Sequence, residues 1–283
     1  MTGETAYAKL NLTLDVLGRR PDGYHEMCMV MESVSLADQL EFSREGSGVR
    51  AESNLAFLDS EKKNLAVLAA LKFQECTGCK VEPLVIRLEK RIPVCAGMGG
   101  GSSDAAAVLR YLNRTFQTGL SSEELGRLGE SIGADVPYCV AGGTVLAEGK
   151  GERLTPLPRL PQCIFVLCKP SFGVSTPMLF KELDRRRTRC HPDTQGLLDA
   201  LGAKDLRGAA RRMYNVFEDV LPARWGMRVA EIKGVLTDSG ALGAAMSGTG
   251  PTVFGVFNDP LLAQNAYQRL REEYSDTFLT HNV

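Results

Sequence analysis

Residues 97–104, Gly-Met-Gly-Gly-Gly-Ser-Ser-Asp, carry the clearest chemical signal in the chain. A strand-like run over 83–94 precedes them, and an Ala-rich pattern with apolar residues at helical spacing follows over 102–113. The first N–H groups of a helix have no partner inside it, the helix dipole is positive there, and glycine lets the backbone approach an anion closely. A strand, a glycine loop and a helix in this order predict a phosphate cradle. The expected backbone contacts are Gly97, Gly99, Gly100 and Gly101.

Two common nucleotide-binding patterns do not fit this glycine loop. A Walker A loop needs a lysine before its Ser or Thr, and no lysine precedes Ser102. In the dinucleotide fingerprint the third glycine position would fall on Ser102 or Asp104. The alternative to a phosphate-binding role is a purely structural one, in which the glycines form a tight turn where the helix packs closely against the strand. We expect Ser102 and Ser103 to cap the helix and to offer hydroxyls to phosphate or a metal ion.

A second glycine cluster, Ser-Gly-Thr-Gly, occupies 247–250 before an apolar strand-like run. By itself it fits an ordinary turn equally well. Together with the first loop it suggests a nucleotide held from two domains, with contacts from Gly248, Thr249 and Gly250.

Lys9 and Asn11 share the polar side of a predicted strand over 8–16, in which apolar and polar residues alternate. An ammonium group on that side could hold a phosphate or keep a nearby carboxylate ionised. The alternation predicts a half-buried strand, so residue types alone favour a solvated lysine and an ordinary hydrogen-bonded asparagine.

Asp135 follows a predicted helix over 121–133. Pro137 biases Val136 away from helical geometry, so we expect a stiff corner that holds the Asp135 carboxylate. A carboxylate in such a position could accept the proton of a hydroxyl that attacks a phosphate. The residues alone also fit a simple aspartate at a helix end.

Tyr24 and His25 follow a Pro-Asp-Gly turn. An aromatic ring can stack on a nucleobase, and an imidazole can hydrogen-bond the edge of a base. Two such residues after an exposed turn favour binding over core packing. Phe180, in a predicted helix over 175–186, fits either a core position or a second aromatic contact.

The composition of the 283-residue chain favours a globular protein of two domains. The net charge of −1 gives no electrostatic reason to expect nucleic acid or an anionic membrane as partner. No apolar run approaches the roughly 18–20 residues of a membrane-spanning helix, and the N-terminus lacks the layout of a targeting peptide. We therefore expect a cytoplasmic protein. Prolines at 156, 158 and 161 place the expected boundary between 1–157 and 158–283.

Hydrophobic periodicity and turn residues predict the remaining elements. Strands are expected at 27–36, 38–43, 49–53 and 163–170, a hairpin at 142–157, a strand pair near 242–257, and helices at 63–78 (ending at Gly78), 121–133 (capped by Ser121 with Glu124), within 194–237 and near 260–274.

Cys76 and Cys79 form a C-x-x-C pair, which raises a zinc or redox protein as an alternative from another class. Redox pairs usually open a helix after a strand, whereas this pair closes a predicted helix. A zinc site needs about two further ligands. The nearest candidates, Cys190 and His191, are remote in sequence, so we favour neither function.

Three segments resemble one family. Residues 93–107, Pro-Val-Cys-Ala-Gly-Met-Gly-Gly-Gly-Ser-Ser-Asp-Ala-Ala-Ala, resemble the ATP loop of the GHMP kinases, named for galacto-, homoserine, mevalonate and phosphomevalonate kinases. Residues 247–251, Ser-Gly-Thr-Gly-Pro, resemble their C-terminal glycine motif. Residues 8–27, with Lys-Leu-Asn-Leu and Pro-Asp-Gly-Tyr-His, and residues 133–152 resemble the branch whose substrate is a cytidine diphosphate-linked methylerythritol. The resemblance spans most of the chain and is weakest over 184–212.

The resemblance implies an α+β, two-domain GHMP kinase fold with the active site in the interdomain cleft. It implies ATP-dependent phosphorylation of the 2-hydroxyl of that substrate, in non-mevalonate isoprenoid biosynthesis. It assigns catalysis to Lys9 and Asp135. Substrate binding is assigned to Asn11, Tyr24, His25, Thr176 and Phe180, and nucleotide binding to the two glycine loops together with Asn64, itself a good helix cap, and Lys90.

Mg²⁺ is expected with ATP, and Ser102, Ser103 or Asp104 could ligate it, without a firm assignment. The rivals within the family are kinases of the homoserine or mevalonate type, which should lack the Tyr24-His25 segment. A nucleotide sensor without catalysis is a third interpretation, against which the intact Lys9 and Asp135 argue. The expected partner is the small-molecule substrate, and the expected assembly is a monomer or weak homodimer.

Overall fold

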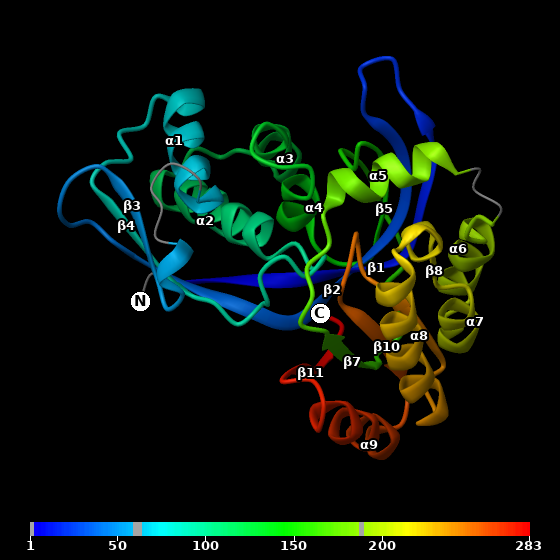
Figure 1. Ribbon diagram of the computed structural model, residues 1–283. Helices are drawn as coiled ribbons and strands as arrows, with labels where there is room; N and C mark the ends of the chain where they lie inside the picture. Colours follow the sequence, from blue (N-terminus) through cyan, green and yellow to red (C-terminus); the bar gives the residue numbers. More distant parts are fainter. Residues whose placement is uncertain (1–2, 59–63, 187–189) are drawn as a thin grey trace.

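The computed structural model describes residues 3–58, 64–186 and 190–283. Figure 1 shows two long strands, β1 and β2, running from a helix-covered layer at one end into the C-terminal part of the chain. The strands are β1 (Gly3–Arg19), β2 (His25–Ser43), β3 (Val49–Ser53), β4 (Leu84–Glu89), β5 (Val145–Gly149), β6 (Arg153–Pro156), β7 (Ile164–Lys169), β8 (Tyr214–Asn215), β9 (Gly243–Met246), β10 (Val253–Phe257) and β11 (Asp276–His281). The helices are α1 (Leu65–Thr77), α2 (Gly100–Phe116), α3 (Ser122–Glu130), α4 (Val136–Ala141), α5 (Thr176–Arg185), α6 (Thr194–Gly202), α7 (Leu206–Arg211), α8 (Ala223–Asp238) and α9 (Pro260–Arg271), with short 3-10 helices η1 (Ala56–Leu58) and η2 (Val216–Val220).

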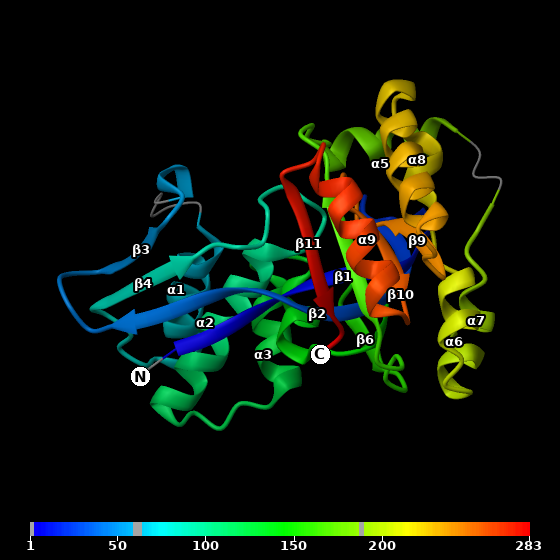
Figure 2. The same cartoon turned by 90° about the horizontal axis from the view of Figure 1, so that it is seen from below.

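The strands form two sheets. The larger sheet has the order β3-β4-β2-β1-β8, with β5 paired to β2 and β6 to β5. The smaller sheet has the order β11-β7-β10-β9, and α8 and α9 pack on it (Figure 2). The short strand β8 belongs to the later part of the chain, yet it pairs in parallel with β1 of the first part. The two parts are thereby joined through the larger sheet, and the expected α+β fold is confirmed.

Local sequence signals account for the helix ends. Asn64 caps α1 by accepting a hydrogen bond from the Ala66 N–H at 2.9 Å, and Gly78 ends it in the left-handed conformation. Ser121 and Glu124 form the expected capping box at the start of α3. The Asn64 and Ser121 side chains satisfy N–H groups that a helix leaves without partners, and the Gly78 N–H satisfies the Gln74 carbonyl, so these three expected end residues are confirmed. The expected extent of the helix to 133 is wrong, because α3 ends at Glu130.

Two predictions about helix starts are wrong. Helix α2 begins at Gly100 with Gly99 as its N-cap, and no side chain caps it. Ser102 and Ser103 therefore lie in its first turn and do not cap it. Val136 is the first residue of α4, because proline is tolerated in a first turn, where the missing N–H costs no hydrogen bond.

The prediction of a half-buried first strand is also wrong, because both faces of β1 are buried. On its polar side Lys9, Asn11, Thr13 and Asp15 are at most 4% exposed. The alternation does distinguish the two faces, but other parts of the fold cover the polar one. A lysine and an aspartate buried in this way require partners within the protein.

Several strand boundaries differ from expectation. The two strands expected at 27–36 and 38–43 are one continuous strand, β2. Strand β4 ends at Glu89, so the following residues up to 94 are free to lead into the glycine loop. Strand β11 has no counterpart among the predicted elements; it pairs with β7 at the edge of the smaller sheet.

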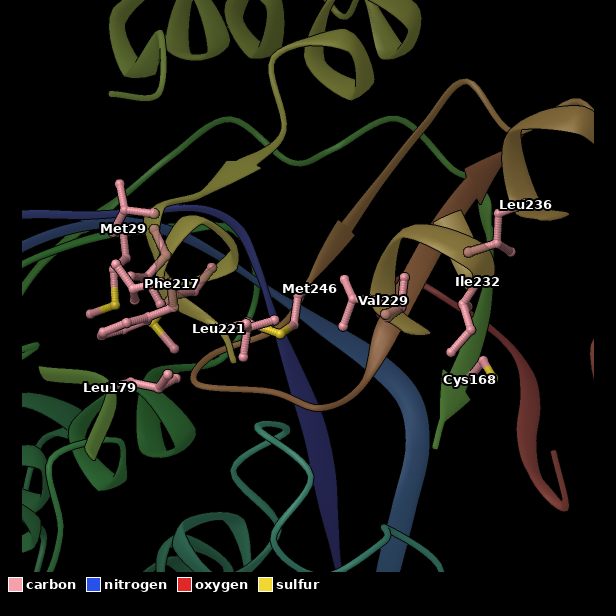
Figure 3. Packing of buried hydrophobic residues seen from close by; sticks show 14 of the residues in the cluster. Met29, Cys168, Leu179, Phe217, Leu221, Val229, Ile232, Leu236 and Met246 are labelled. Atoms are coloured by element: carbon pink, nitrogen blue, oxygen red, sulfur yellow. The ribbon is translucent and has the colours of Figure 1, made fainter. Parts of the chain in front are cut away.

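The hydrophobic core does not stop at residue 157. One cluster contains Met29 on β2 together with Cys168 on β7, Leu179 on α5 and Ile232 on α8 (Figure 3). The parts 1–157 and 158–283 therefore share buried apolar surface, and the boundary between them stays a prediction. Among the described residues, no helix is long and apolar enough to cross a membrane.

Glu32, on β2, is a buried carboxyl group that is 1% exposed. Its Oε2 accepts a hydrogen bond from Thr144 Oγ1 at 2.6 Å. Burial raises the pKa of Glu32 from 4.5 to about 7, although the Thr144 hydrogen bond opposes the shift. Because the folded pKa lies above the unfolded one, the folded chain binds more protons in this interval. The free energy of unfolding therefore falls as the pH rises from 4.5 to about 7.

We expect Glu32→Gln to raise the free energy of unfolding by up to about 3 kcal/mol at a pH of about 8, and to change it little at a pH of about 4. Glutamine keeps an acceptor for Thr144 and removes the buried charge. Urea unfolding of both proteins at the two pH values measures the difference. An equal effect at both would contradict the burial argument.

Candidate active site

The first glycine loop borders a cavity of about 310 Å³. Gly97 and Gly99 adopt φ values of 75° and 68°, which glycine reaches without strain. The first hydrogen bond of this helical turn runs from the Ser103 N–H to the Gly99 carbonyl, at 2.8 Å. The N–H groups of 100–102 thus precede the helical ladder and lie at its positive end. The cavity has the backbone chemistry of an anion site.

Lys9 and Asp135 meet beside this loop. The Lys9 ammonium lies 3.5 Å from Asp135 Oδ2 and donates to Asn11 Oδ1 at 2.7 Å. Asp135 is the N-cap residue of α4, but its side chain makes no capping hydrogen bond, so the carboxylate is left for Lys9. Lys9 is almost fully buried, whereas the Asp135 side chain is 34% exposed. The pair is a buried cation that holds a carboxylate open to solvent on one side.

Gly99 links this pair to the first cavity. A Cβ atom built on Gly99 would lie 3.0 Å from Lys9 Cγ and 3.7 Å from Asp135 Oδ2. Gly99 itself lines the cavity. Ala134, which precedes Asp135 in the chain, lines a second cavity. Each cavity therefore has a lining residue next to the pair, Gly99 in the first and Ala134 in the second.

The other polar residues of the first loop have different surroundings. Ser102 lines the cavity, whereas the Ser103 hydroxyl donates to the Tyr7 carbonyl and is 2% exposed. Lys90 also lines the cavity, but its ammonium binds the carboxylates of Asp38 and Asp104. Ser102 is free to contact a ligand, while Ser103 and Lys90 contribute hydrogen bonds and charge to the fold. Nucleotide contacts by these residues stay predictions.

Asp104 has an unusual environment. It is 4% exposed, and its Oδ1 has no hydrogen-bond partner among the described residues. Burial raises the pKa of Asp104, against the nearby Lys90 ammonium, which lowers it. A buried carboxylate oxygen without a partner is costly, which is compatible with a ligand or cation completing its contacts.

The second cavity, of about 850 Å³, opens between the two parts of the chain. Tyr24 lines it from the turn before β2, His25 from the first position of β2, and Thr176 and Phe180 from α5. The His25 and Phe180 rings stack with centroids 4.5 Å apart. The exposed Tyr24 ring has the Lys150 ammonium 5.2 Å from its centroid. Phe180 is thus paired with His25 and not with Tyr24.

The predicted site residues did not include the three cations and three carboxylates of this second cavity, which are Arg19, Lys150, Lys181, Glu130, Glu152 and Asp184. The Lys150 ammonium pairs with Glu130 at 3.0 Å, and Asp184 accepts from His25 Nε2 at 2.8 Å. Lys150 is the central residue of the Gly-Lys-Gly turn, for which the sequence predicts only a hairpin. Its position in a turn gave no indication that the lysine would face Tyr24.

Asn64 lines the first cavity, whereas residues 247–250 do not. Asn64 also caps α1. Gly248 instead lies behind Gly97, since a Cβ atom built on Gly248 would lie 2.9 Å from the Gly97 carbonyl oxygen. The Thr249 hydroxyl is 2.8 Å from the Thr176 hydroxyl. Direct contacts of 248–250 with a nucleotide stay a prediction.

Cys76 and Cys79 are free thiols at the end of α1. No group of three or more His, Cys, Asp or Glu side chains suited to a metal ion occurs in the part of the chain that the structure describes. The pair therefore lacks the further ligands that zinc would need.

Cys95 offers a direct test of whether a nucleotide binds in the first cavity, because this exposed thiol lines it. We expect ATP to slow alkylation of Cys95 by iodoacetamide by about tenfold or more when ATP is present well above its Kd. Cys76 and Cys190 are also exposed and serve as internal controls, with unchanged rates. Peptide mass spectrometry over a labelling time course resolves the three sites. Equal protection of all three would place the nucleotide elsewhere.

Fold and loops together define a GHMP kinase. Residues 64–143 match the GHMP kinases N terminal domain, and residues 197–276 match GHMP kinases C terminal. A curated relative from Clostridium botulinum (strain Alaska E43), named 4-diphosphocytidyl-2-C-methyl-D-erythritol kinase, is 41% identical over 278 residues, which cover 98% of this chain and 99% of the relative. The chain therefore belongs to the 4-diphosphocytidyl-2-C-methyl-D-erythritol kinase family within the GHMP kinases.

Solved structures agree with this placement. A crystal structure of 4-(cytidine 5'-diphospho)-2C-methyl-D-erythritol kinase superposes with a TM-score of 0.82 and 33% identity, covering 99% of this chain and 98% of that one. A homoserine kinase from Cytophaga hutchinsonii reaches a TM-score of 0.73 at 18% identity, covering 100% of this chain and 95% of that one. The second likeness shows a common fold alone, so the homoserine-type alternative is not favoured.

Proposed function

We propose that the chain transfers the γ-phosphoryl group of ATP to the 2-hydroxyl of 4-diphosphocytidyl-2-C-methyl-D-erythritol, giving the 2-phosphate and ADP in the non-mevalonate isoprenoid pathway. The observation that carries the proposal is the Lys9–Asp135 pair, 3.5 Å apart, next to Gly99 of a cavity with anion-binding backbone groups and next to Ala134 of a larger cavity with aromatic and charged side chains. The kinase family to which the chain belongs supports the same substrate.

Each part of the pair has a role in the proposed transfer. Asp135 accepts the proton of the 2-hydroxyl as the oxygen attacks phosphorus. The Lys9 ammonium keeps Asp135 ionised and stabilises the negative charge on the transferred group. Asn11 orients the Lys9 ammonium through its 2.7 Å hydrogen bond. Positioning and charge stabilisation account for most of the catalysis in phosphoryl transfer.

Each of the two cavities binds one of the two substrates in the proposed reaction. The N–H groups of 100–102 and the Ser102 hydroxyl hold the ATP phosphates. In the larger cavity the aromatic side chains of Tyr24, His25 and Phe180 take the cytosine, with Thr176 beside them. Three carboxylates and three cations line the same cavity, and the cations Arg19, Lys150 and Lys181 suit the diphosphate of the substrate, with Lys150 held beside Glu130.

Mg²⁺, when bound with ATP, would supply positive charge that neutralises the phosphate groups. The residues fit such an ion, because Ser102 is accessible at the cavity and Asp104 Oδ1 is a buried oxygen without a hydrogen-bond partner among the described residues. Ser102 and Asp104 would hold the ion directly or through its water.

A coupled ADP-release assay tests the proposal. The purified protein with ATP and Mg²⁺ is offered the cytidyl substrate, homoserine and mevalonate in parallel. We expect turnover with the cytidyl substrate alone. Turnover with homoserine or mevalonate and none with the cytidyl compound would overturn the assignment. A cytoplasmic location and a monomeric or weakly dimeric state remain part of the proposal, and gel filtration with light scattering tests the latter.

A further inference from the structure

The second glycine loop packs against the back of the first one. A Cβ atom built on Gly97 would lie 2.2 Å from the Ser247 carbonyl oxygen and 3.1 Å from the Gly250 nitrogen. The Ser247 hydroxyl donates to the Gly97 carbonyl at 2.9 Å and accepts from the Asn11 N–H at 3.3 Å. The loop 247–250 thus supports the nucleotide loop and the strand of Lys9 at the same time.

Asn215 holds this supporting loop from the opposite side. Its Nδ2 donates to the carbonyls of Met246 and Gly248, both at 2.7 Å, and its Oδ1 accepts from the Phe217 N–H at 3.0 Å. The side chain is fully buried, so both of its amide protons and its oxygen are used within the protein. Asn215 lies on β8, in register with Leu14 of β1.

The same loop also reaches the acceptor cavity. The hydroxyl of Thr249 lies 2.8 Å from that of Thr176, which lines the larger cavity at the start of α5. One short segment therefore touches the nucleotide loop through Gly97 and the acceptor side through Thr176. The two Asn215 hydrogen bonds span Ser247 and hold this segment together with backbone bonds such as that from the Ser247 N–H to the Thr252 carbonyl at 2.9 Å.

We infer that Asn215 is a positioning residue for phosphoryl transfer, which acts by fixing the loop 246–250 between the nucleotide and acceptor cavities. Asn215 touches neither substrate. A displaced loop would lose its contacts with Gly97 and Thr176, and a misplacement of about 1 Å costs about 100-fold in rate. The inference rests on the proposed transfer between these cavities. Its test distinguishes a failure of the inference from a failure of the proposed function.

The test substitution is Asn215→Asp, which keeps the size of the side chain and the acceptor for Phe217. It removes at least one of the two donated bonds and sets a carboxyl group against two carbonyl oxygens. We expect kcat to fall about 100-fold relative to the unmodified protein, and the affinity for a non-hydrolysable ATP analogue to fall about tenfold. Each rate is divided by the concentration of folded protein, which is measured by circular dichroism at the assay temperature.

Asn113→Asp is the matched control. Asn113 clamps the loop after α2 in the same manner, with Nδ2 donating to the Leu120 carbonyl at 2.8 Å and Oδ1 accepting from the Leu120 N–H at 3.0 Å. It lies at the far end of α2, about 20 Å from the glycine loop by helix length. We expect a lower melting temperature in both variants, but unchanged kcat and nucleotide affinity in Asn113→Asp.

A purely structural Asn215 would lower the melting temperature and leave kcat and nucleotide affinity of the folded protein within about twofold, which would overturn the inference. If Asn215→Asp does not fold, Ser247→Ala decides, since it removes the hydroxyl that links Gly97 and Asn11. A fall in kcat of about tenfold or more supports the inference, and a smaller change overturns it. Absence of turnover in the unmodified protein would count against the proposed function alone, because the analogue titration still measures the loop.

Discussion

Replacing Asp135 by asparagine is expected to abolish turnover and to leave the affinity for ATP unchanged. Asparagine has the same size and keeps an acceptor for Lys9, but it cannot take up a proton from the substrate hydroxyl. Loss of a general base typically costs between about 10²-fold and 10⁴-fold in rate. Since the Asp135 side chain makes no capping hydrogen bond, the helix that follows loses nothing.

The measurement combines ADP release with an ATP-analogue titration on the same preparation. Asp259→Asn is a suitable control, because Asp259 caps α9 by accepting from the Leu261 N–H at 2.8 Å, and asparagine caps equally well. That variant should keep full activity. An Asp135→Asn protein with normal kcat would show that the proton leaves by another route.

The second large effect is expected from Gly97→Ala. The added Cβ would lie 2.2 Å from the Ser247 carbonyl oxygen, far inside van der Waals contact, and the opposing atom belongs to the backbone. The two glycine loops must then separate. We expect kcat/KM for ATP to fall by at least about 100-fold, with a loss of about 1–3 kcal/mol in the free energy of unfolding.

Gly119→Ala separates this clash from backbone strain. Gly119 has a φ of 69°, close to the 75° of Gly97, but a Cβ there meets no atom within 4 Å. The strain of a positive φ alone costs about 1–2 kcal/mol. Gly119→Ala should therefore lose stability and keep kcat/KM. Similar kinetics in the two variants would contradict the packing of the two loops.

Much of the fold could be predicted from local signals. The alternation over 8–16, the Asn64 and Ser121 caps and the stop at Gly78 each depend on neighbours a few residues away, and the structure contains them. What failed depended on distant parts of the chain. The burial of Lys9 and Asn11 comes from loops far along the sequence that cover the polar face of β1.

The candidate site shows the same division. The anion-binding character of 97–102 follows from residue types and order, because backbone N–H groups need no partner side chain. The engagement of Lys90 with Asp38 and Asp104, and of His25 with Phe180 and Asp184, arises from tertiary contacts that no spacing reveals. The role of Asn215 was likewise invisible, since an asparagine after a tyrosine has no signature.

The contact between Gly97 and the second loop has a consequence for how the protein is made. Ser247, which holds the Gly97 carbonyl, lies 150 residues further along the chain. During synthesis from the N-terminus, the nucleotide loop emerges long before the segment that supports it from behind. A ribosome-bound chain that ends before residue 247 therefore carries the phosphate-binding residues but not their support. We therefore expect the ability to hold ATP in a reactive position to be acquired only after the segment around residue 247 has been made.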